Sequence, residues 1–342
     1  MALYAGTGTP GKVYRYNSGT DWTLISGDMD GAVLCLCSYN GVLYAGTGRR
    51  DSSDGYLYKY MGGTTWEQVG GALDTQVSSL AIHNGNLYIG TGRNVMKIYR
   101  LDGDNVVLVY DRTGGYAYGG RSLFSHGGNL YQGDWLYDII YRDNAIVLDP
   151  TVTGIWGSCI WDFAENGGVI YAGGYDGRYY YSSDGISWSN YRGAPFTAGD
   201  YPEDNIWAVD SFKGDIYFGC AALYKGTAHT HIWSSPGDKY INILSLLNDG
   251  NTMYIGVGGD LGFDIWPTSG YVYSYTGSGS PALISGEFDG GVHCLAFHDA
   301  WNIWVKKSDE WIEVPEIWVK KGGVWNPVTE VWTKKGGVWN PV

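Results

Sequence analysis

The six residues LYAGTG at positions 3–8 are repeated unchanged at positions 43–48 and return as LYIGTG at positions 87–92. Four looser copies follow: NLYQGD from Asn129, VIYAGG from Val169, DIYFGC from Asp215 and TMYIGV from Thr252. The copies lie about forty residues apart, and a phrase that returns at such a period indicates an array of similar structural units.

The surroundings of each copy are those of a small antiparallel sheet. An apolar strand and a tight turn precede it, as in AVLCLCSYNG (32–41) and VSSLAIHNG (77–85), where Asn-Gly suits the positive φ angles of a two-residue hairpin. Two more short strands follow in most units, as in GYLYKY (55–60) and TWEQVGG (65–71). Four strands per unit at this period predict the blades of a β-propeller.

The two ends of the repeat region predict how the ring closes. Residues 291–298 match the first strand of a unit, whose remaining strands are missing there, and residues 1–26 supply a second, third and fourth strand. We therefore expect an all-β, seven-bladed β-propeller over residues 1–300, closed by pairing its N- and C-terminal strands in one blade. A ring of six and a half blades is the alternative, because no clear fourth strand follows His231.

Composition supports this fold class and narrows the function. The chain of 342 residues has 54 glycines and 16% aromatic residues, which favours an all-β protein. Its net charge of −13 disfavours nucleic acid or an anionic membrane as the main partner. The N-terminus lacks a basic segment followed by an apolar one, and no apolar run approaches membrane-spanning length, so we expect no signal peptide and no membrane insertion.

The sequence carries few signs of catalytic or metal chemistry. Glu203 and Asp204 could act as paired carboxylates in a glycosidase or lyase, although acidic residues are abundant enough for chance pairs. His229 and His231 would share one face of a strand and could form half of a metal site, but no third ligand is identifiable, and we expect a solvated outer strand. We predict no catalytic residues, no metal and no cofactor. The five cysteines have no metal-ligand spacing and are read as reduced core residues: Cys35, Cys37, Cys159, Cys220 and Cys294.

Turn lengths separate the two faces of the predicted ring. The turns between first and second strands, and most of those between third and fourth strands, are short and share one face. Long aromatic segments begin at Asp111, Arg192 and Gly258 and would emerge from the opposite face, where a rigid scaffold usually carries its binding residues. The candidate ligand-binding residues are Tyr116, Tyr118, Trp135, Phe196, Asp200, Tyr201, Glu203, Asp204, Phe263, Asp264 and Trp266. The alternative is that these loops only cover the central channel.

The segment SSDGISW (182–188) resembles the Asp-box of sialidases and related propellers. The resemblance implies a structural turn between third and fourth strands, in which the aspartate bonds backbone amides and the tryptophan packs between blades. The matching residues are Ser182, Asp184, Gly185, Ser187 and Trp188; Trp22 and Trp66 occupy the same place in degenerate copies. A sialidase also needs three arginines around a carboxylate and a Tyr–Glu pair, and no such set can be identified, so we expect no sialidase activity.

The end of the chain repeats with a step of fourteen residues: IWVKKSDEWIEV, IWVKKGGVWNPV and VWTKKGGVWNPV, from Ile303 to Val342. This pattern predicts three β-hairpins, with turns at 308–309, 322–323 and 336–337. Isolated hairpins are marginally stable, and exposed apolar surfaces mark interaction sites. We therefore expect residues 301–342, called the tail below, to be an attachment or oligomerisation module. Its candidate interface residues are Trp304, Trp311, Trp318, Trp325, Trp332 and Trp339. The alternative is a tail folded back on its own propeller.

The tail also carries a family resemblance. Tandem Trp-Val-Lys-Lys-Gly-Gly-Val-Trp units resemble the ends of virion structural proteins of tailed bacteriophages, and propellers rich in glycine and tyrosine are similar to appendage proteins of these viruses. The resemblance covers 303–342 closely and the propeller only in style. It implies a non-enzymatic capsid or tail-fibre decoration protein, made in the host cytoplasm and incorporated into the virion.

In such a protein the tail would bind other virion proteins or identical tails, giving a homo-oligomer, and the propeller would contact the host surface or a glycan. Aromatic side chains beside carboxylates suit carbohydrate binding, because sugar C–H faces stack on rings while hydroxyls bond to polar groups. The alternative is a carbohydrate-active propeller enzyme, a glycosidase or lyase, or a bacterial lectin.

Overall fold

The computed structural model describes the residues 1–49, 54–73, 75–92, 96–112, 120–134, 137–149, 159–175, 177–193, 205–234, 241–259 and 269–298, together with six strands between 303 and 341. The chain divides into two compact units, Met1–His298 and Asp299–Val342. Within these described ranges, no helix is long and apolar enough to cross a membrane.

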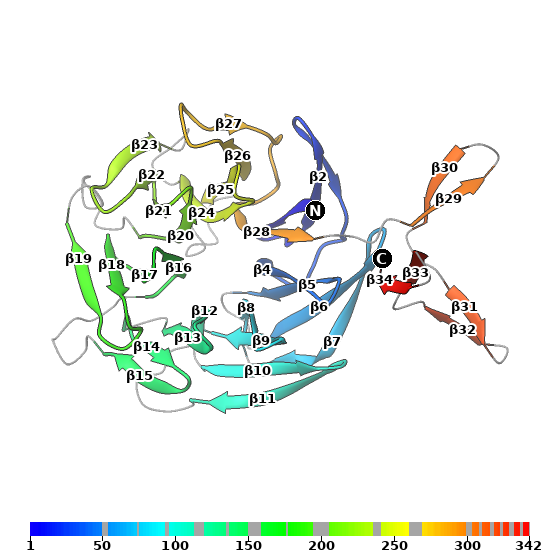
Figure 1. Ribbon diagram of the computed structural model, residues 1–342, viewed down its shortest axis with the longest axis horizontal. Helices are drawn as coiled ribbons and strands as arrows, with labels where there is room; N and C mark the ends of the chain where they lie inside the picture. The colour runs from blue at the N-terminus through cyan, green and yellow to red at the C-terminus, as the bar shows by residue number, and fades with distance from the viewer. Residues whose placement is uncertain are drawn as a thin grey trace. The chain divides into compact units, whose positions relative to one another are not determined.

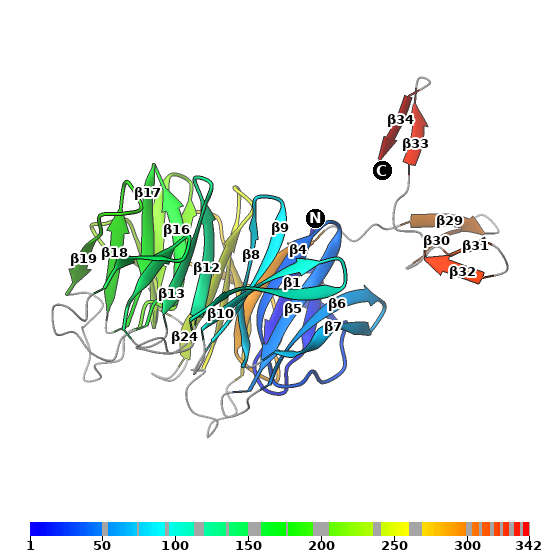
Figure 2. The same ribbon diagram turned by 90° about the horizontal axis from the view of Figure 1, so that it is seen from below.

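The larger unit is a seven-bladed β-propeller, as predicted. Seven four-stranded antiparallel sheets stand around a ring (Figure 1). Seen from the side, strands such as β8, β12 and β16 run between the two faces of the ring (Figure 2). Blade 1 contains β28 (Val292–His298), β1 (Ala2–Thr7), β2 (Val13–Ser18) and β3 (Asp21–Leu24); blade 2, β4 (Ala32–Tyr39), β5 (Val42–Gly48), β6 (Gly55–Gly62) and β7 (Thr65–Leu73); blade 3, β8 (Val77–His83), β9 (Asn86–Thr91), β10 (Lys97–Asp102) and β11 (Asn105–Asp111); blade 4, β12 (Gly120–His126), β13 (Asn129–Asp134), β14 (Ile140–Arg142) and β15 (Ala145–Leu148). Blade 5 contains β16 (Asp162–Asn166), β17 (Val169–Gly173), β18 (Arg178–Ser182) and β19 (Ser189–Arg192); blade 6, β20 (Ala208–Phe212), β21 (Asp215–Gly219), β22 (Ala222–Lys225) and β23 (Thr230–Ser234); blade 7, β24 (Ile241–Asn248), β25 (Met253–Gly259), β26 (Tyr271–Tyr275) and β27 (Ala282–Leu283).

The two ends of the larger unit meet in blade 1. Strand β28 pairs antiparallel with β1, with Ala2 opposite His298 and Tyr4 opposite Ala296. This pairing is the predicted closure. The alternative of six and a half blades is wrong, because β23 completes blade 6 with a fourth strand. A register shift where β22 pairs β23 interrupts the alternation that would have marked β23 in the sequence.

The tight turns between first and second strands have the predicted backbone geometry. Asn40 and Gly41 have φ angles of 49° and 75°, and Asn84 and Gly85 have 48° and 74°. Positive φ at both central residues gives the turn a twist that matches the flanking strands. The Asn-Gly pairs therefore fix the register of β4 on β5 and of β8 on β9.

The glycine of the repeated phrase lets neighbouring blades approach closely. A Cβ on Gly46 would lie 2.4 Å from Cγ1 of Val77 in the next blade, and one on Gly6 would lie 2.6 Å from Cγ1 of Val33. Neither glycine has a positive φ, so the requirement is for space and not for backbone freedom. A branched side chain of the next blade comes as close at four further junctions: Gly133 with Ile160, Gly173 with Ile206, Gly219 with Ile243 and Gly256 with Val292.

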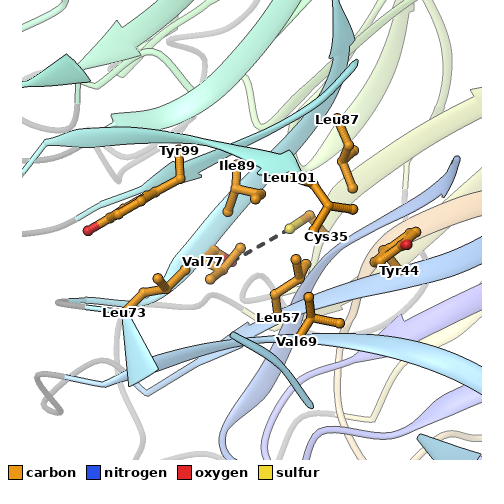
Figure 3. Packing of buried hydrophobic residues seen from close by; sticks show 10 residues of the cluster. All are labelled: Cys35, Tyr44, Leu57, Val69, Leu73, Val77, Leu87, Ile89, Tyr99 and Leu101. Atoms are coloured by element: carbon orange, nitrogen blue, oxygen red, sulfur yellow. Dashed lines mark hydrogen bonds between the residues drawn. The ribbon is translucent and has the colours of Figure 1, made fainter. Parts of the chain in front are cut away.

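The hydrophobic core is distributed over the junctions between blades. Figure 3 shows the junction of blades 2 and 3, where Leu57, Val69 and Leu73 face Val77 and Ile89. The Cys35 thiol, in the same cluster, donates a hydrogen bond of 3.5 Å to the Val77 carbonyl oxygen. Each blade thus buries its faces only between two neighbours, as in other repeat architectures.

The smaller unit contains three two-stranded antiparallel sheets. Their strands are β29 (Ile303–Lys307) with β30 (Glu310–Val314), β31 (Trp318–Lys321) with β32 (Val324–Pro327), and β33 (Trp332–Lys335) with β34 (Val338–Pro341).

Candidate binding site in the central channel

All seven blades contribute to a central cavity of about 210 Å³, six through their first strands and blade 6 through Trp207, directly before its first strand. A cavity to which every repeat contributes is the natural place to look for a site. Its lining residues are Leu34, Cys35, Leu36, Ser78, Ser79, Leu80, Ser122, Leu123, Trp161, Asp162, Trp207, Leu244, Ser245, Leu246, His293, Cys294 and Leu295.

One position in each first strand lies opposite the glycine of the second strand. Across the blades it is occupied by Cys294, Cys35, Ser79, Ser122, Asp162, Ala208 and Ser245. Four of these side chains donate to a carbonyl oxygen of the next blade: Cys294 to Val33, Cys35 to Val77, Ser122 to Ile160 and Ser245 to Val292. This position therefore serves mainly to join blades.

Asp162 departs from this pattern, because it brings a carboxylate to a position that is otherwise small. One carboxylate oxygen accepts the backbone N–H of Val209 in blade 6 at 3.0 Å, and the other accepts that of Phe163 at 2.9 Å. Although part of the side chain borders the cavity, protein surrounds it, and this burial raises the pKa of Asp162 to about 7. The two N–H bonds oppose the rise, and the nearby Asp210 adds to it. The carboxyl group therefore changes charge near neutral pH.

Two indoles lie beside this carboxyl group. Trp161 and Trp207 directly precede Asp162 and Ala208, and their ring centroids are 4.1 Å apart with the planes tilted by 43°. Trp207 is 6% exposed, and its Nε1 has no hydrogen-bond partner in the described part of the chain. The same position is occupied by Leu34, Ser78, Arg121, Leu244 and His293 in the other blades, so the pair of indoles is confined to blades 5 and 6.

Leucines contribute to the lining of the cavity from five blades. The residue that follows the glycine-facing position is leucine in five blades: Leu295, Leu36, Leu80, Leu123 and Leu246. A lining that combines leucines, indoles and a carboxyl group suits a small ligand that has both apolar and polar groups. In the ranges that the structure describes, no group of three His, Cys, Asp or Glu side chains could hold a metal ion.

The structure does not describe the loop residues that the sequence selected. Tyr116, Tyr118, Trp135, Phe196, Asp200, Tyr201, Glu203, Asp204, Phe263, Asp264 and Trp266 all lie outside the described residues. Their role in ligand binding stays a prediction. Sequence reasoning missed Trp161, Asp162 and Trp207, which become noticeable only when the seven first strands are aligned on the glycine of the second strand.

The Ser182–Trp188 turn is held by its own hydrogen bonds. The Asp184 carboxylate accepts the N–H groups of Ile186 at 2.8 Å and Ser187 at 2.7 Å and the Ser182 hydroxyl at 2.9 Å. These bonds hold the pKa of Asp184 well below its usual range. Gly185, with a φ of 68°, donates its N–H to the Ser182 hydroxyl.

The tryptophans at this place in three blades contact the preceding blade. Trp188 packs against Tyr131 of blade 4, with ring centroids 6.4 Å apart. The indole N–H of Trp22 donates to the Ile284 carbonyl oxygen at 2.8 Å, and that of Trp66 donates to the Ile25 carbonyl oxygen at 2.9 Å. These turns and their tryptophans therefore join blades.

The expected pair of histidines on one strand face is not present. His229 lies in the turn before β23 with a φ of 54°, so only His231 belongs to the strand. The His229 ring packs 4.5 Å from Tyr191 of blade 5, and its burial lowers its pKa. The expectation of two solvated strand residues is thus wrong for His229, because the turn carries its ring onto the neighbouring blade.

The cysteines have the structural character that the sequence predicted. No disulfide joins the five of them, all of which lie in described ranges, and four are buried. Burial raises the pKa of the Cys37 thiol to about 11. Its thiolate is therefore scarce at neutral pH, which disfavours a nucleophilic role.

No known protein family and no curated protein matches this sequence at a significant level. Solved structures do match its fold. The computationally designed Ika8 protein has a TM-score of 0.51 and 13% identity, over 91% of this chain and 95% of that chain. Sqt1 of Saccharomyces cerevisiae has a TM-score of 0.57 and 13% identity, over 92% and 89%. The WD40 β-propeller domain of Doa1 has a TM-score of 0.52 and 13% identity, over 74% and 86%. At this identity the likeness shows the fold alone.

Proposed function

We propose that the chain is a non-enzymatic structural protein of a tailed-bacteriophage virion, a capsid or tail-fibre appendage. The tail attaches it to other virion proteins or to identical tails, and the propeller is presented for binding to the host surface or a glycan. The observation that carries this proposal is the register of the three tail hairpins.

In each hairpin the two tryptophans occupy positions on the same face of the sheet. Trp304 lies opposite Glu313, and Trp311 lies opposite Lys306, two residues after Trp304. Directly opposite residues, and residues two apart on one strand, share a face of an antiparallel pair. The second and third hairpins repeat the arrangement: Trp318 with Trp325, and Trp332 with Trp339.

A two-stranded sheet has no second layer of its own to cover such a face, and isolated hairpins are marginally stable in water. A partner chain that covers the face supplies the missing layer. Three similar hairpin faces in one tail also bind a repetitive partner more tightly than one face does. Once the first face is bound, the effective concentration of the second and third faces at the partner is high. Repetition of one hairpin therefore suits attachment to a repetitive assembly.

Sedimentation velocity of the full chain over a range of concentrations tests this proposal. We expect an oligomer, and we expect replacement of one tryptophan per hairpin (Trp304→Ser, Trp318→Ser and Trp332→Ser) to give a monomer with unchanged circular dichroism of the propeller. The matched control replaces residues on the opposite faces: Val305→Ser, Val319→Ser and Thr333→Ser. A full chain that stays monomeric at every concentration contradicts self-assembly, and failure to enter particles alongside other virion proteins then contradicts attachment as well.

A carbohydrate-active enzyme is the second candidate, and the raised pKa of Asp162 favours it, because a carboxyl group that titrates near pH 7 suits a general acid. Glycosidases of the common classes need two carboxyl groups. Asp162 is the one carboxylate among the described residues that line the cavity. Polysaccharide cleavage that disappears in Asp162→Asn would favour this candidate over the structural protein.

A further inference from the structure

Blades 5 and 6 bring to the central cavity residues that the other blades lack. Asp162 replaces a residue that is Cys, Ser or Ala in the other blades, and Trp161 and Trp207 replace residues that include Leu34 and Ser78. All three substitutions come from the adjacent blades 5 and 6. Asp162 joins blade 5 to blade 6 through the Val209 N–H, but Cys or Ser makes the corresponding link at other junctions, so a carboxyl group is not needed for it. Places where a repeat breaks its own pattern are candidates for function.

The size of the cavity limits its ligand. Its volume of about 210 Å³ is below the range of about 300–1,000 Å³ that is typical for pockets of drug-sized ligands. The cavity therefore suits a single small ring and not an extended oligomer. A longer ligand could place only its terminal unit there.

The side chains that line the cavity indicate which class of small ring it could bind. The partly exposed Trp161 indole offers an apolar face, and Asp162 offers a carboxyl group that can accept further hydrogen bonds. The half-buried lining residue His293 adds ring nitrogens, which can both donate and accept hydrogen bonds. A cation would satisfy only the carboxylate and the indole faces, and a hydrocarbon would satisfy only the apolar surface. Hydroxyl groups both donate and accept, so a polyhydroxylated ring matches the whole set.

We propose that the central cavity binds one sugar ring, with its C–H face against Trp161 and a hydroxyl group hydrogen-bonded to the carboxyl group of Asp162. This inference deepens the proposed function by giving the propeller one glycan-binding position. It rests on the proposed function for the biological source of the sugar, and it does not depend on the tail.

The test is a titration of the full chain with D-glucose, D-galactose, D-mannose, N-acetyl-D-glucosamine and tetramethylammonium, followed by calorimetry and saturation-transfer NMR. We expect at least one sugar to bind saturably, and Trp161→Ala to weaken its binding about tenfold or more. Asp162→Asn should also weaken it. Tyr181→Ala is the matched control, because this tyrosine lies in the same blade, is 39% exposed and does not line the cavity.

A second variant keeps the test decisive if Trp161→Ala fails to fold. Leu34→Phe narrows the cavity from blade 2 without changing a polar group, and it should abolish sugar binding while circular dichroism stays unchanged. The proposal is overturned if none of the four sugars binds saturably, if only tetramethylammonium binds, or if the Trp161 and Tyr181 variants lose the same affinity. The chain with Trp304→Ser, Trp318→Ser and Trp332→Ser should keep its sugar affinity, so the failure of either proposal can be told from that of the other.

Discussion

The smallest residues set the distance between the blades. A Cβ at position 46 would lie 2.4 Å from Cγ1 of Val77 and 2.5 Å from the sulfur of Cys35, closer than side-chain carbons approach one another. Both neighbours belong to the buried cluster between blades 2 and 3, so neither can move without disturbing it. The repeated phrase therefore records a packing constraint between blades.

Gly46→Ala should lower the free energy of unfolding by about 1–3 kcal/mol, because it overpacks this junction. Urea denaturation followed by circular dichroism measures the change. Gly71→Ala is the control, since a Cβ there meets nothing within 4 Å, and it should change stability by about 0.5 kcal/mol or less. Adding Val77→Ala to Gly46→Ala should recover part of the loss, and strict additivity of the two changes would argue against this contact.

Asp162 should make stability depend on pH near neutrality. Its pKa is about 7 in the folded chain, against about 3.9 in an unfolded chain, so the folded state binds this proton more tightly. The contribution is complete below the unfolded pKa and is lost as the pH rises through 7. Between pH 8 and pH 6 the free energy of unfolding should therefore rise by about 1 kcal/mol from this group.

Denaturant unfolding of the native chain and of Asp162→Asn at several pH values measures this effect, since the difference between the two cancels other titrating groups. The two curves should diverge across neutral pH. Curves that stay parallel from pH 8 to pH 6 would mean that burial does not raise this pKa.

Among the elements, the start of the fourth strand joins each of three blades to the preceding one through a tryptophan. Trp22 does so at the junction of blades 1 and 7, where its indole N–H reaches a carbonyl oxygen 262 positions away in the chain. Trp66 repeats the contact at the next junction. The start of the fourth strand thus carries a recurring link between blades, in addition to the apolar packing and to the hydrogen bonds made by the first strands.

Trp22→Phe keeps an aromatic ring but removes the donor, so it should destabilise the fold by about 1–3 kcal/mol, because the Ile284 carbonyl oxygen loses its partner. The thermal midpoint measures the effect. Trp66→Phe should give a similar loss at its own junction. No change in either variant would show that the indole N–H groups add nothing beyond ring packing.

The sequence predicts elements well where the determinant is local. Asn-Gly turns and alternating strands depend on residues a few positions apart, and the return of one phrase about every forty residues shows how many such units there are, so together they predict seven blades. The sequence does not reveal strand β23, because a register shift interrupts its alternation. The prediction that His229 lies in a strand is wrong, because a residue with positive φ ends the turn there. Trp161, Asp162 and Trp207 meet only after several blades have packed, and periodicity along one strand carries no such information.

Over the whole chain, the propeller and the tail differ in how their strands are paired. Strand β28, from the C-terminal end of the propeller, is the first strand of blade 1 and pairs with β1 from the N-terminal end. Blade 1 therefore has four paired strands like the other blades, and the ring closes within one chain. Each tail sheet has two strands only, with its two tryptophan positions on one face, and this is why we propose that the tail binds a partner.

Hydroxyl-radical footprinting of the tail tryptophans over a dilution series of the full chain, read out by mass spectrometry, tests most directly whether partner chains cover the tail. We expect the tail indoles to be protected at high concentration and modified on dilution, while the buried Trp207 stays protected throughout. The indoles to follow are those of Trp318, Trp325, Trp332 and Trp339. Equal protection of the tail indoles at every concentration, with the chain sedimenting as a monomer, would contradict this proposal, because the tail would then cover its own tryptophans.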